Sequence, residues 1–226
     1  MSQELMQAFS DIGAELQLKH GGRRVEIDVR ALHDREVFLL RRPVFDRITA
    51  EPVDVRPHHR HLVLDVYGDW LPTSGRFLCG HDEQHWFVAP VPFGRQTQSV
   101  RGAMEALKPD IVRREQKRKG VNQRRRNRRR TEAYVRQGEW FFLPRPRMHV
   151  APDQVEHNVP LAREGGQPHL VESMHVMDET LMFARGRISH PDHATLHLDV
   201  WHRVVQNNEH VSERQTTSRL HLAFVD

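Results

Sequence analysis

The sequence predicts an α+β protein with mainly antiparallel β structure, in which two β-rich lobes are joined by a basic helical segment and an N-terminal amphipathic helix comes first. Three observations support this fold class. Apolar residues near the N-terminus recur at helical spacing, short alternating or β-branched runs occur in both halves of the chain, and thirteen lysines and arginines fall within residues 108–136. We expect lobes at 1–95 and 138–226, with the arginine-rich segment at 96–137.

The N-terminal helix is predicted from apolar residues at three- and four-residue spacing, and Gly21-Gly22 is expected to end it. Its apolar stripe consists of Met6, Phe9, Ile12 and Leu16. The alternating stretch "RRVEIDVRAL" and the following "EVFLL" predict a hairpin. Residues 43–60 contain three prolines and no clear period, so we expect a loop there.

The rest of the first lobe is expected to be a buried strand at 61–67 and a strand pair, "RFLCG" and "HWFVAPV", around the turn "HDEQ". "SVRGAMEAL" and "KPDIVRREQKRKG" predict short helices, the second with proline in its first turn.

The second lobe is predicted to begin with the buried strand "GEWFFLP", which places a boundary near Gln137-Gly138. A polar loop is expected at 144–168. Four further strands are predicted in "PHLVESMHVM", "TLMFARGRIS", "ATLHLDVWHRVV" and "RLHLAFVD", with "HPDH" as a hairpin turn.

Composition limits the kind of protein. A chain of 226 residues is long enough to bury a core, and its single cysteine, Cys79, excludes an intramolecular disulfide and any zinc site that needs two or more cysteines. There is no apolar run of ~20 residues, and the first residues do not resemble a signal peptide. We therefore expect a cytoplasmic protein.

The positive charge is concentrated in one segment. Residues 108–136 carry thirteen bases and three acids, a net +10, whereas the remainder carries 21 bases and 27 acids, a net −6. Such a segment is costly to hold compact without counter-charge, and arginine binds phosphate in a bidentate manner. The sequence thus predicts contacts with nucleic acid, RNA or a ribonucleoprotein in preference to a specific duplex site. The predicted contact residues are Arg113, Arg114, Lys117, Arg118, Lys119, Arg124, Arg125, Arg126, Arg128, Arg129, Arg130 and Tyr134.

Other readings of this segment remain open. It could be a solvated charge run, or it could lie against the acidic remainder of the chain or an acidic partner protein. A membrane surface is disfavoured because no apolar face accompanies the charges. Tyr134 is the aromatic residue expected to stack on unpaired bases, whereas 140–143 is predicted to be a buried strand.

The sequence contains two histidine-rich stretches in which a metal site could form. "HDEQH" lacks the spacing of the H-E-x-x-H zinc motif and lies between strand-like flanks, so a hairpin loop is predicted, and nearby Cys79 is expected to pack in the core. In the second stretch, His197 and Asp199 are expected on one face of a strand, close enough to bind a single ion. The third ligand would come from the turn, His193 or His190, or from another strand, for example His221, and we name His193, His197 and Asp199 as the candidate set.

The second stretch also resembles in part an HNH nuclease, whose metal site uses a histidine at a strand end and a later asparagine and histidine on a helix. His193 and Asn208 match the first two positions, but His210 follows Asn208 too closely, and "VWHRVVQNN" has the pattern of a strand. We assign no family from it.

No glycine-rich phosphate loop and no G-x-S-x-G motif occurs in the sequence. The sequence therefore favours a non-enzymatic, nucleic-acid-associated protein with no cofactor and no assigned catalytic residues. Two alternatives are a metal-dependent hydrolase, such as a nuclease, that uses a divalent ion, and an assembly or adaptor protein whose basic arm binds an acidic partner.

Overall fold

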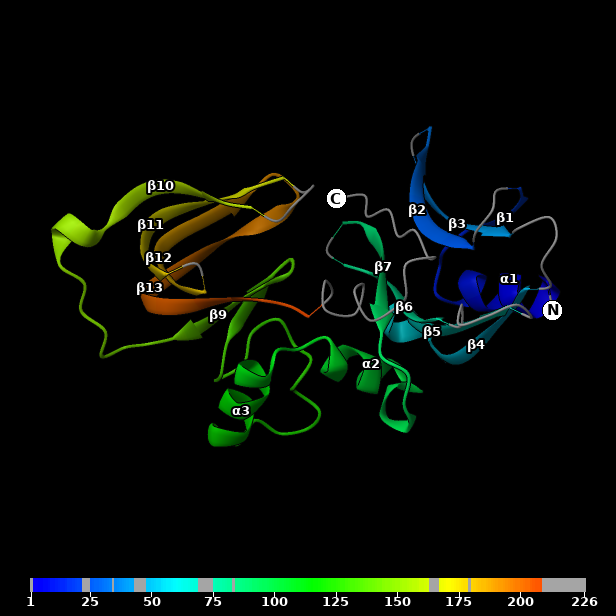
Figure 1. Ribbon diagram of the computed structural model, residues 1–226, viewed down its shortest axis with the longest axis horizontal. Helices are drawn as coiled ribbons and strands as arrows, with labels where there is room; N and C mark the ends of the chain where they lie inside the picture. The colour runs from blue at the N-terminus through cyan, green and yellow to red at the C-terminus, as the bar shows by residue number, and fades with distance from the viewer. Residues whose placement is uncertain are drawn as a thin grey trace. The chain divides into compact units, whose positions relative to one another are not determined.

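The computed structural model describes residues 2–21, 25–33, 35–42, 48–68, 75–82, 84–162, 167–178 and 180–208. Two compact units make up the chain, which passes from the first to the second between Leu107 and Lys108 and returns to the first at Asn208. Both units are built mainly from antiparallel strands, and the described part of the chain contains three α-helices (Figure 1). This confirms the predicted α+β, mainly antiparallel β, class.

The first unit contains two sheets. The three-stranded sheet has the order β1-β3-β2, in which β2 and β3 are antiparallel and β1 is parallel to β3. The four-stranded antiparallel sheet has the order β4-β5-β6-β7. The elements are α1 (Ser2–Asp11), β1 (Leu16–His20), β2 (Glu26–Leu32), β3 (Arg35–Arg42), β4 (Ile48–Arg56), β5 (His61–Gly68), β6 (Gly75–His81), β7 (Trp86–Val91), α2 (Val100–Ala106) and the 3₁₀ turns η1 (Pro57–His59) and η2 (Arg95–Thr97).

The first helix is shorter than the sequence predicts. It ends at Asp11 because Gly13 adopts a left-handed conformation (φ 82°), in which its N–H bonds to Ser10 O at 2.9 Å. Leu16 therefore begins strand β1 and does not extend the helix. The buried apolar face also differs from the predicted stripe. Met6 is 41% exposed, and the buried residues are Leu5, Ala8, Phe9 and Ile12.

The loop predicted at 43–60 is wrong for half of its length, because Ile48–Arg56 forms β4. This strand lies at the edge of its sheet, where a proline costs no ladder hydrogen bond, and its register shifts between Pro52 and Asp54. Residues 43–47 lie outside the described part. The predicted hairpins of β2 with β3 and of β6 with β7 are confirmed.

A buried ion pair fastens the four-stranded sheet to the chain that follows it. Arg76 donates from Nε to Asp65 Oδ1 at 2.6 Å and from Nη2 to Asp65 Oδ2 at 2.7 Å. Its Nη1 also donates to Gly94 O at 2.8 Å, and both side chains are at most 5% exposed. This arrangement holds η2, from which α2 continues.

The second unit is one six-stranded antiparallel sheet in the order β10-β11-β12-β13-β9-β8, together with helix α3. The elements are α3 (Asp110–Arg118), β8 (Val135–Gln137), β9 (Trp140–Pro144), η3 (Pro152–Gln154), β10 (Glu156–Leu161), β11 (His169–Asp178), β12 (Leu181–His190) and β13 (His193–Gln206). The segment predicted as a loop at 144–168 thus contains strand β10, which is a mainly exposed edge strand. The stretch "RLHLAFVD" lies outside the described residues.

Hairpin β8–β9 has an apolar cluster on each face. Trp140 and Phe142 pack with the strands of the large sheet, whereas Phe141 and Leu143 pack with Val112 of α3 and with the chain between α3 and β8. Consecutive strand residues point to opposite faces, which explains the four-residue apolar run at 140–143. The boundary expected near Gln137-Gly138 falls in the turn of this hairpin, inside the second unit.

Candidate functional site

Helix α3 presents most of its basic residues to solvent. Val112 and Gln116 are buried, whereas Arg113, Arg114, Lys117 and Arg118 lie on the exposed side. Val112 and Gln116 are four residues apart and share the inner face, and the exposed residues repeat this spacing on the outer face, Arg113 with Lys117 and Arg114 with Arg118.

The chain from residue 119 to residue 134, which we call the basic loop, is folded against α3 and the β8–β9 hairpin. Its main attachment is the carbonyl oxygen of Arg126, which accepts hydrogen bonds from Lys108 Nζ at 2.7 Å, Gln116 Nε2 at 2.7 Å and the Tyr134 hydroxyl at 2.6 Å. All three donor side chains are nearly fully buried, with at most 4% exposure. The loop backbone is therefore held from inside the unit.

Backbone hydrogen bonds within turns and one isolated β-bridge also stabilise the basic loop. Arg128 N–H donates to Arg125 O at 3.0 Å, and Arg136 N–H donates to Arg129 O at 2.7 Å. Arg130 pairs with Val135 as an isolated bridge. Because the carbonyl of Arg126 faces inward and the turns are closed locally, the loop keeps a defined backbone although it contains the sequence RRRNRRR.

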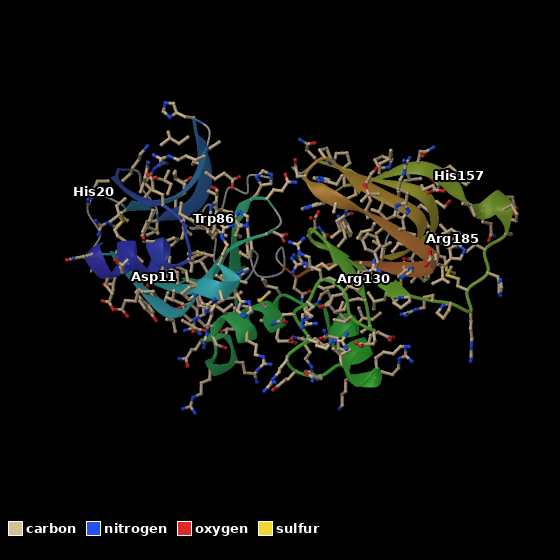
Figure 2. All side chains as sticks on the ribbon, turned by 180° about the vertical axis from the view of Figure 1, so that it is seen from behind. Asp11, His20, Trp86, Arg130, His157 and Arg185 are labelled. Carbon is tan, nitrogen blue, oxygen red and sulfur yellow. The ribbon has the colours of Figure 1, made fainter. Side chains whose placement is uncertain are left out.

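Three of the predicted contact residues have acidic partners close by. Arg113 pairs with Asp110, Arg118 pairs with Glu115 at 2.6 Å, and Arg125 pairs with Glu132 at 2.5 Å. Each pair is partly exposed, so each is worth little to stability. Among the described residues, no acidic oxygen lies within 4.0 Å of six other exposed basic side chains. We call these six the basic surface: Arg114, Lys117, Lys119, Arg124, Arg128 and Arg130 (Figure 2 labels Arg130).

The other predicted contact residues lie deeper. Arg126 and Arg129 are half-buried, and Arg126 Nε donates to Val121 O at 3.3 Å. Tyr134 is only 1% exposed and packs edge-on against Phe141 with ring centroids 5.0 Å apart. Its ring is therefore covered, and it supports the loop where the sequence suggested stacking on bases.

A second feature of this unit is a cluster of three histidines that we call the histidine triad: His169, His190 and His193. Each lies at the end of one of three adjacent strands, β11, β12 and β13. His190 pairs with His193 across the tight hairpin, and Leu170 pairs with Ser189, which brings His169 next to His190. Ring centroids are 4.4 Å apart for His169 and His190 and 4.7 Å apart for His190 and His193.

His169 is the most deeply buried member of the triad. It is 1% exposed, and neither ring nitrogen has a hydrogen-bond partner among the described residues. Burial, reinforced by the nearby His190 and His193 rings, lowers the pKa of His169 to about 3, so the ring is neutral at physiological pH. Sequence reasoning missed His169 because it lies on another strand, more than twenty residues before His193.

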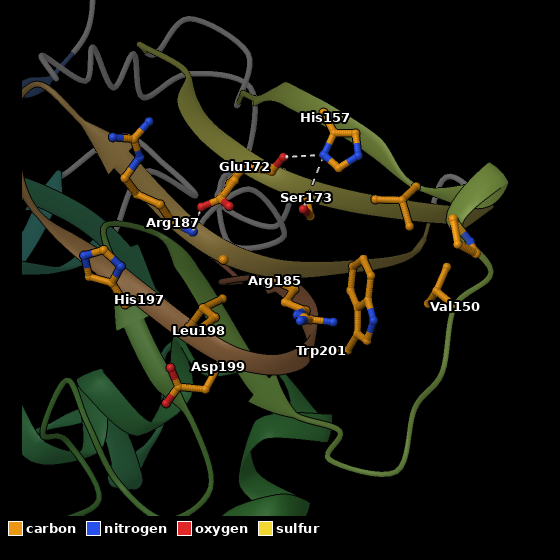
Figure 3. A pocket seen from close by; sticks show the side chains of 13 residues that line it. Val150, His157, Glu172, Ser173, Arg185, Arg187, His197, Leu198, Asp199 and Trp201 are labelled. Atoms are coloured by element: carbon orange, nitrogen blue, oxygen red, sulfur yellow. Dashed lines mark hydrogen bonds between the residues drawn. The ribbon is translucent and has the colours of Figure 1, made fainter.

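His197 and Asp199, the other two predicted metal ligands, are exposed and do not belong to this triad. They line a groove of about 540 Å³ on β10–β13, together with His157, Glu172 and Trp201 (Figure 3). In this groove Arg187 N–H donates to Glu172 Oε2 at 2.7 Å. The structure thus brings His193 together with His190, as the sequence allowed, and separates it from His197 and Asp199.

The strands on either side of the first histidine-rich stretch, β6 and β7, pair as the predicted hairpin. His85 Nδ1 lies 2.8 Å from Glu36 Oε1. Cys79 is fully buried, and burial raises the pKa of its thiol, so it remains protonated and packs in the core.

Comparison with protein-family models, with curated proteins and with solved structures finds no match. Among the described residues, no helix has the length and apolar character that crossing a membrane requires.

Proposed function

We propose that this protein binds nucleic acid, RNA in particular, through the phosphate backbone, using the basic loop and the exposed face of α3. The proposal rests on two features of one segment: its backbone is held by buried hydrogen-bond donors, and most of its basic side chains point to solvent. The Arg126 carbonyl is held by three buried donors, while no acidic oxygen of the described residues lies within 4.0 Å of the six basic-surface side chains.

A fixed backbone favours phosphate binding because little ordering is needed when the partner arrives. Charges crowded on one loop and one helix face repel one another, and phosphates relieve that repulsion while releasing condensed counterions. Four of the six basic-surface residues are arginines, which can form two parallel hydrogen bonds to one phosphate.

Recognition of bases by stacking has no support in this region. Large hydrophobic side chains that are exposed occur elsewhere among the described residues, and Tyr134 is buried. Binding should therefore depend on charge and backbone shape more than on sequence.

The experiment compares two triple variants of the full chain by fluorescence polarisation with a labelled oligouridylate. One is Arg124→Ser/Arg128→Ser/Arg130→Ser, which removes half of the basic surface. The control removes three exposed arginines of the same unit outside the loop, Arg147, Arg185 and Arg187, and so changes the net charge equally. Each phosphate contact to a single strand contributes about 0.7 decades of affinity at ~0.1 M salt, so the loop variant should bind roughly 100-fold more weakly.

We expect the control variant to stay within about threefold of the wild type, since a general loss of charge acts weakly through screened solvent. Equal affinity of the two variants would refute the proposal. Competition with an oligodeoxynucleotide of equal length and with polyglutamate separates the partner classes. If polyglutamate displaces the oligouridylate at equal charge concentration, the surface is one for acidic proteins.

A further inference from the structure

The histidine triad lies where three strand ends meet at one edge of a sheet. His169 opens β11, His190 closes β12 and His193 opens β13 after a two-residue turn. The candidate ligand atoms of the three rings all lie within 4.8 Å of one another. This juxtaposition depends on strand pairing and not on sequence spacing.

We propose that His169, His190 and His193 bind a single divalent transition-metal ion of the zinc class through their ring nitrogens. Imidazole is a preferred ligand of zinc, copper and nickel, whereas magnesium and calcium require oxygen ligands. Nitrogens on a tetrahedral zinc at about 2.0–2.1 Å lie roughly 3.4 Å apart, so the rings must converge by about an ångström on binding. His193 is half-buried, which leaves it room to turn.

The state of His169 is the second, independent observation. The His169 ring is 1% exposed and neither of its nitrogens has a hydrogen-bond partner among the described residues, an arrangement that is costly in a folded protein. A bound ion would occupy one of these nitrogens. Coordination to a metal would give the buried ring a polar partner.

The surroundings of the triad provide space and a supporting shell. A Cβ atom placed on Gly138 (φ 53°) would lie 3.1 Å from His193 Nε2 and 3.5 Å from His169 Nε2, so both nitrogens face a position that the glycine leaves open. His190 Nε2 lies 3.3 Å from Gln167 O, a long contact that an ion could replace. His190 Nδ1 accepts a hydrogen bond from the Asp192 N–H at 3.1 Å, which orients this ring beside the other two.

Three protein ligands leave one coordination position of a tetrahedral ion for water or another small ligand. This inference does not depend on the RNA-binding proposal, because the triad and the basic surface share no residue.

The test is isothermal titration of the metal-stripped full chain with Zn²⁺, supported by the visible absorption bands of Co²⁺ in the same site. We expect one ion per chain. Removing a residue that only hydrogen-bonds to a metal ligand typically lowers metal affinity about 10–100-fold. His193→Gln removes a ligand itself, so it should lower Zn²⁺ affinity at least ~100-fold. The matched control His197→Gln changes an exposed histidine of the same strand and should bind as the wild type does.

A second pair of variants removes no ligand. Gly138→Ala and Gly120→Ala both place alanine at a left-handed position, φ 53° and φ 62°, but the added methyl meets the triad only at Gly138. Only Gly138→Ala should weaken Zn²⁺ binding. The expected loss is about tenfold or more, which is typical of substitutions that disturb the residues around metal ligands. Absence of Zn²⁺ binding to the wild type, or equal affinity of His193→Gln and His197→Gln, would overturn the proposal.

Discussion

Replacing Tyr134 by phenylalanine should loosen the basic loop without removing a charge. The Tyr134 hydroxyl donates to Arg126 O at 2.6 Å and lies 3.0 Å from Arg128 O. Phenylalanine keeps the ring packed against Phe141 but leaves the Arg128 carbonyl without this partner, while Arg126 O retains Lys108 and Gln116. The loss of one hydrogen bond, together with a carbonyl that is left poorly satisfied, should lower the free energy of opening the loop by about 1–2 kcal/mol.

Native-state hydrogen exchange measures this loss locally. A decrease of about 1–2 kcal/mol raises the exchange rate of amides that open with the loop by roughly 5–30-fold. The Arg128 and Arg136 amides, both hydrogen-bonded within this structure, are the reporters. Affinity for RNA should change by less than about threefold, because every charge remains and Arg126 O keeps the donors Lys108 and Gln116, which still hold the loop backbone.

The matched control is Tyr67→Phe, which removes a hydroxyl that donates to Asp65 Oδ2 at 2.7 Å in the first unit. It should leave exchange of the Arg128 and Arg136 amides unchanged. If Tyr134→Phe also leaves these amides unchanged, the hydroxyl does not hold the loop and the argument for a fastened backbone fails.

The remaining predictions concern stability. Asp65→Asn breaks the buried pair with Arg76 and should destabilise the protein by about 3 kcal/mol in urea denaturation, with Tyr67→Phe costing clearly less; equal costs would contradict the account. Gly102→Ala, which in an open helix would stabilise by about 1 kcal/mol, should destabilise here by roughly 1–3 kcal/mol, since its Cβ would lie 1.6 Å from Gln96 O; a raised melting temperature would refute this. Burial lowers the pKa of His202 despite its hydrogen bond to the Val200 carbonyl, so the unfolded chain takes up the proton first and stability falls as pH drops through about 6.5. The stability advantage of the wild type over His202→Gln should therefore shrink between about pH 7.5 and about pH 5.5, and a constant difference would contradict the assignment.

Much of the strand pattern could be predicted from the sequence because apolar alternation and turn residues report it directly. The hairpins of β2 with β3, of β6 with β7 and of β12 with β13 all follow such signals. Edge strands β4 and β10 were missed because they contain Pro52 and Pro160 and carry few buried residues, so their pairing depends on a neighbouring strand and not on their own pattern.

The members of the histidine triad could not be identified by strand alternation. Counting along one strand places His193 on the same face as His197 and Asp199, but the β12–β13 register shifts between Ile188 and His190. A shift of one residue moves a side chain to the other face, so His193 leaves that set. His169 comes from a different strand altogether.

The basic segment illustrates the opposite case. Its charge was plain in the sequence, but its conformation was not, because RRRNRRR has no apolar period. The backbone is fixed by Lys108, Gln116 and Tyr134, polar groups that reach it from outside the run. Tertiary hydrogen bonds of this kind leave no local signature.

The salt dependence of oligouridylate binding by the wild-type protein tests the central claim most directly. If all six residues of the basic surface contact phosphates, the slope of log affinity against log salt should be about −4, and affinity should fall roughly 300-fold between about 50 mM and about 200 mM salt. A fall of less than about threefold over this range would show that the basic surface does not bind phosphates.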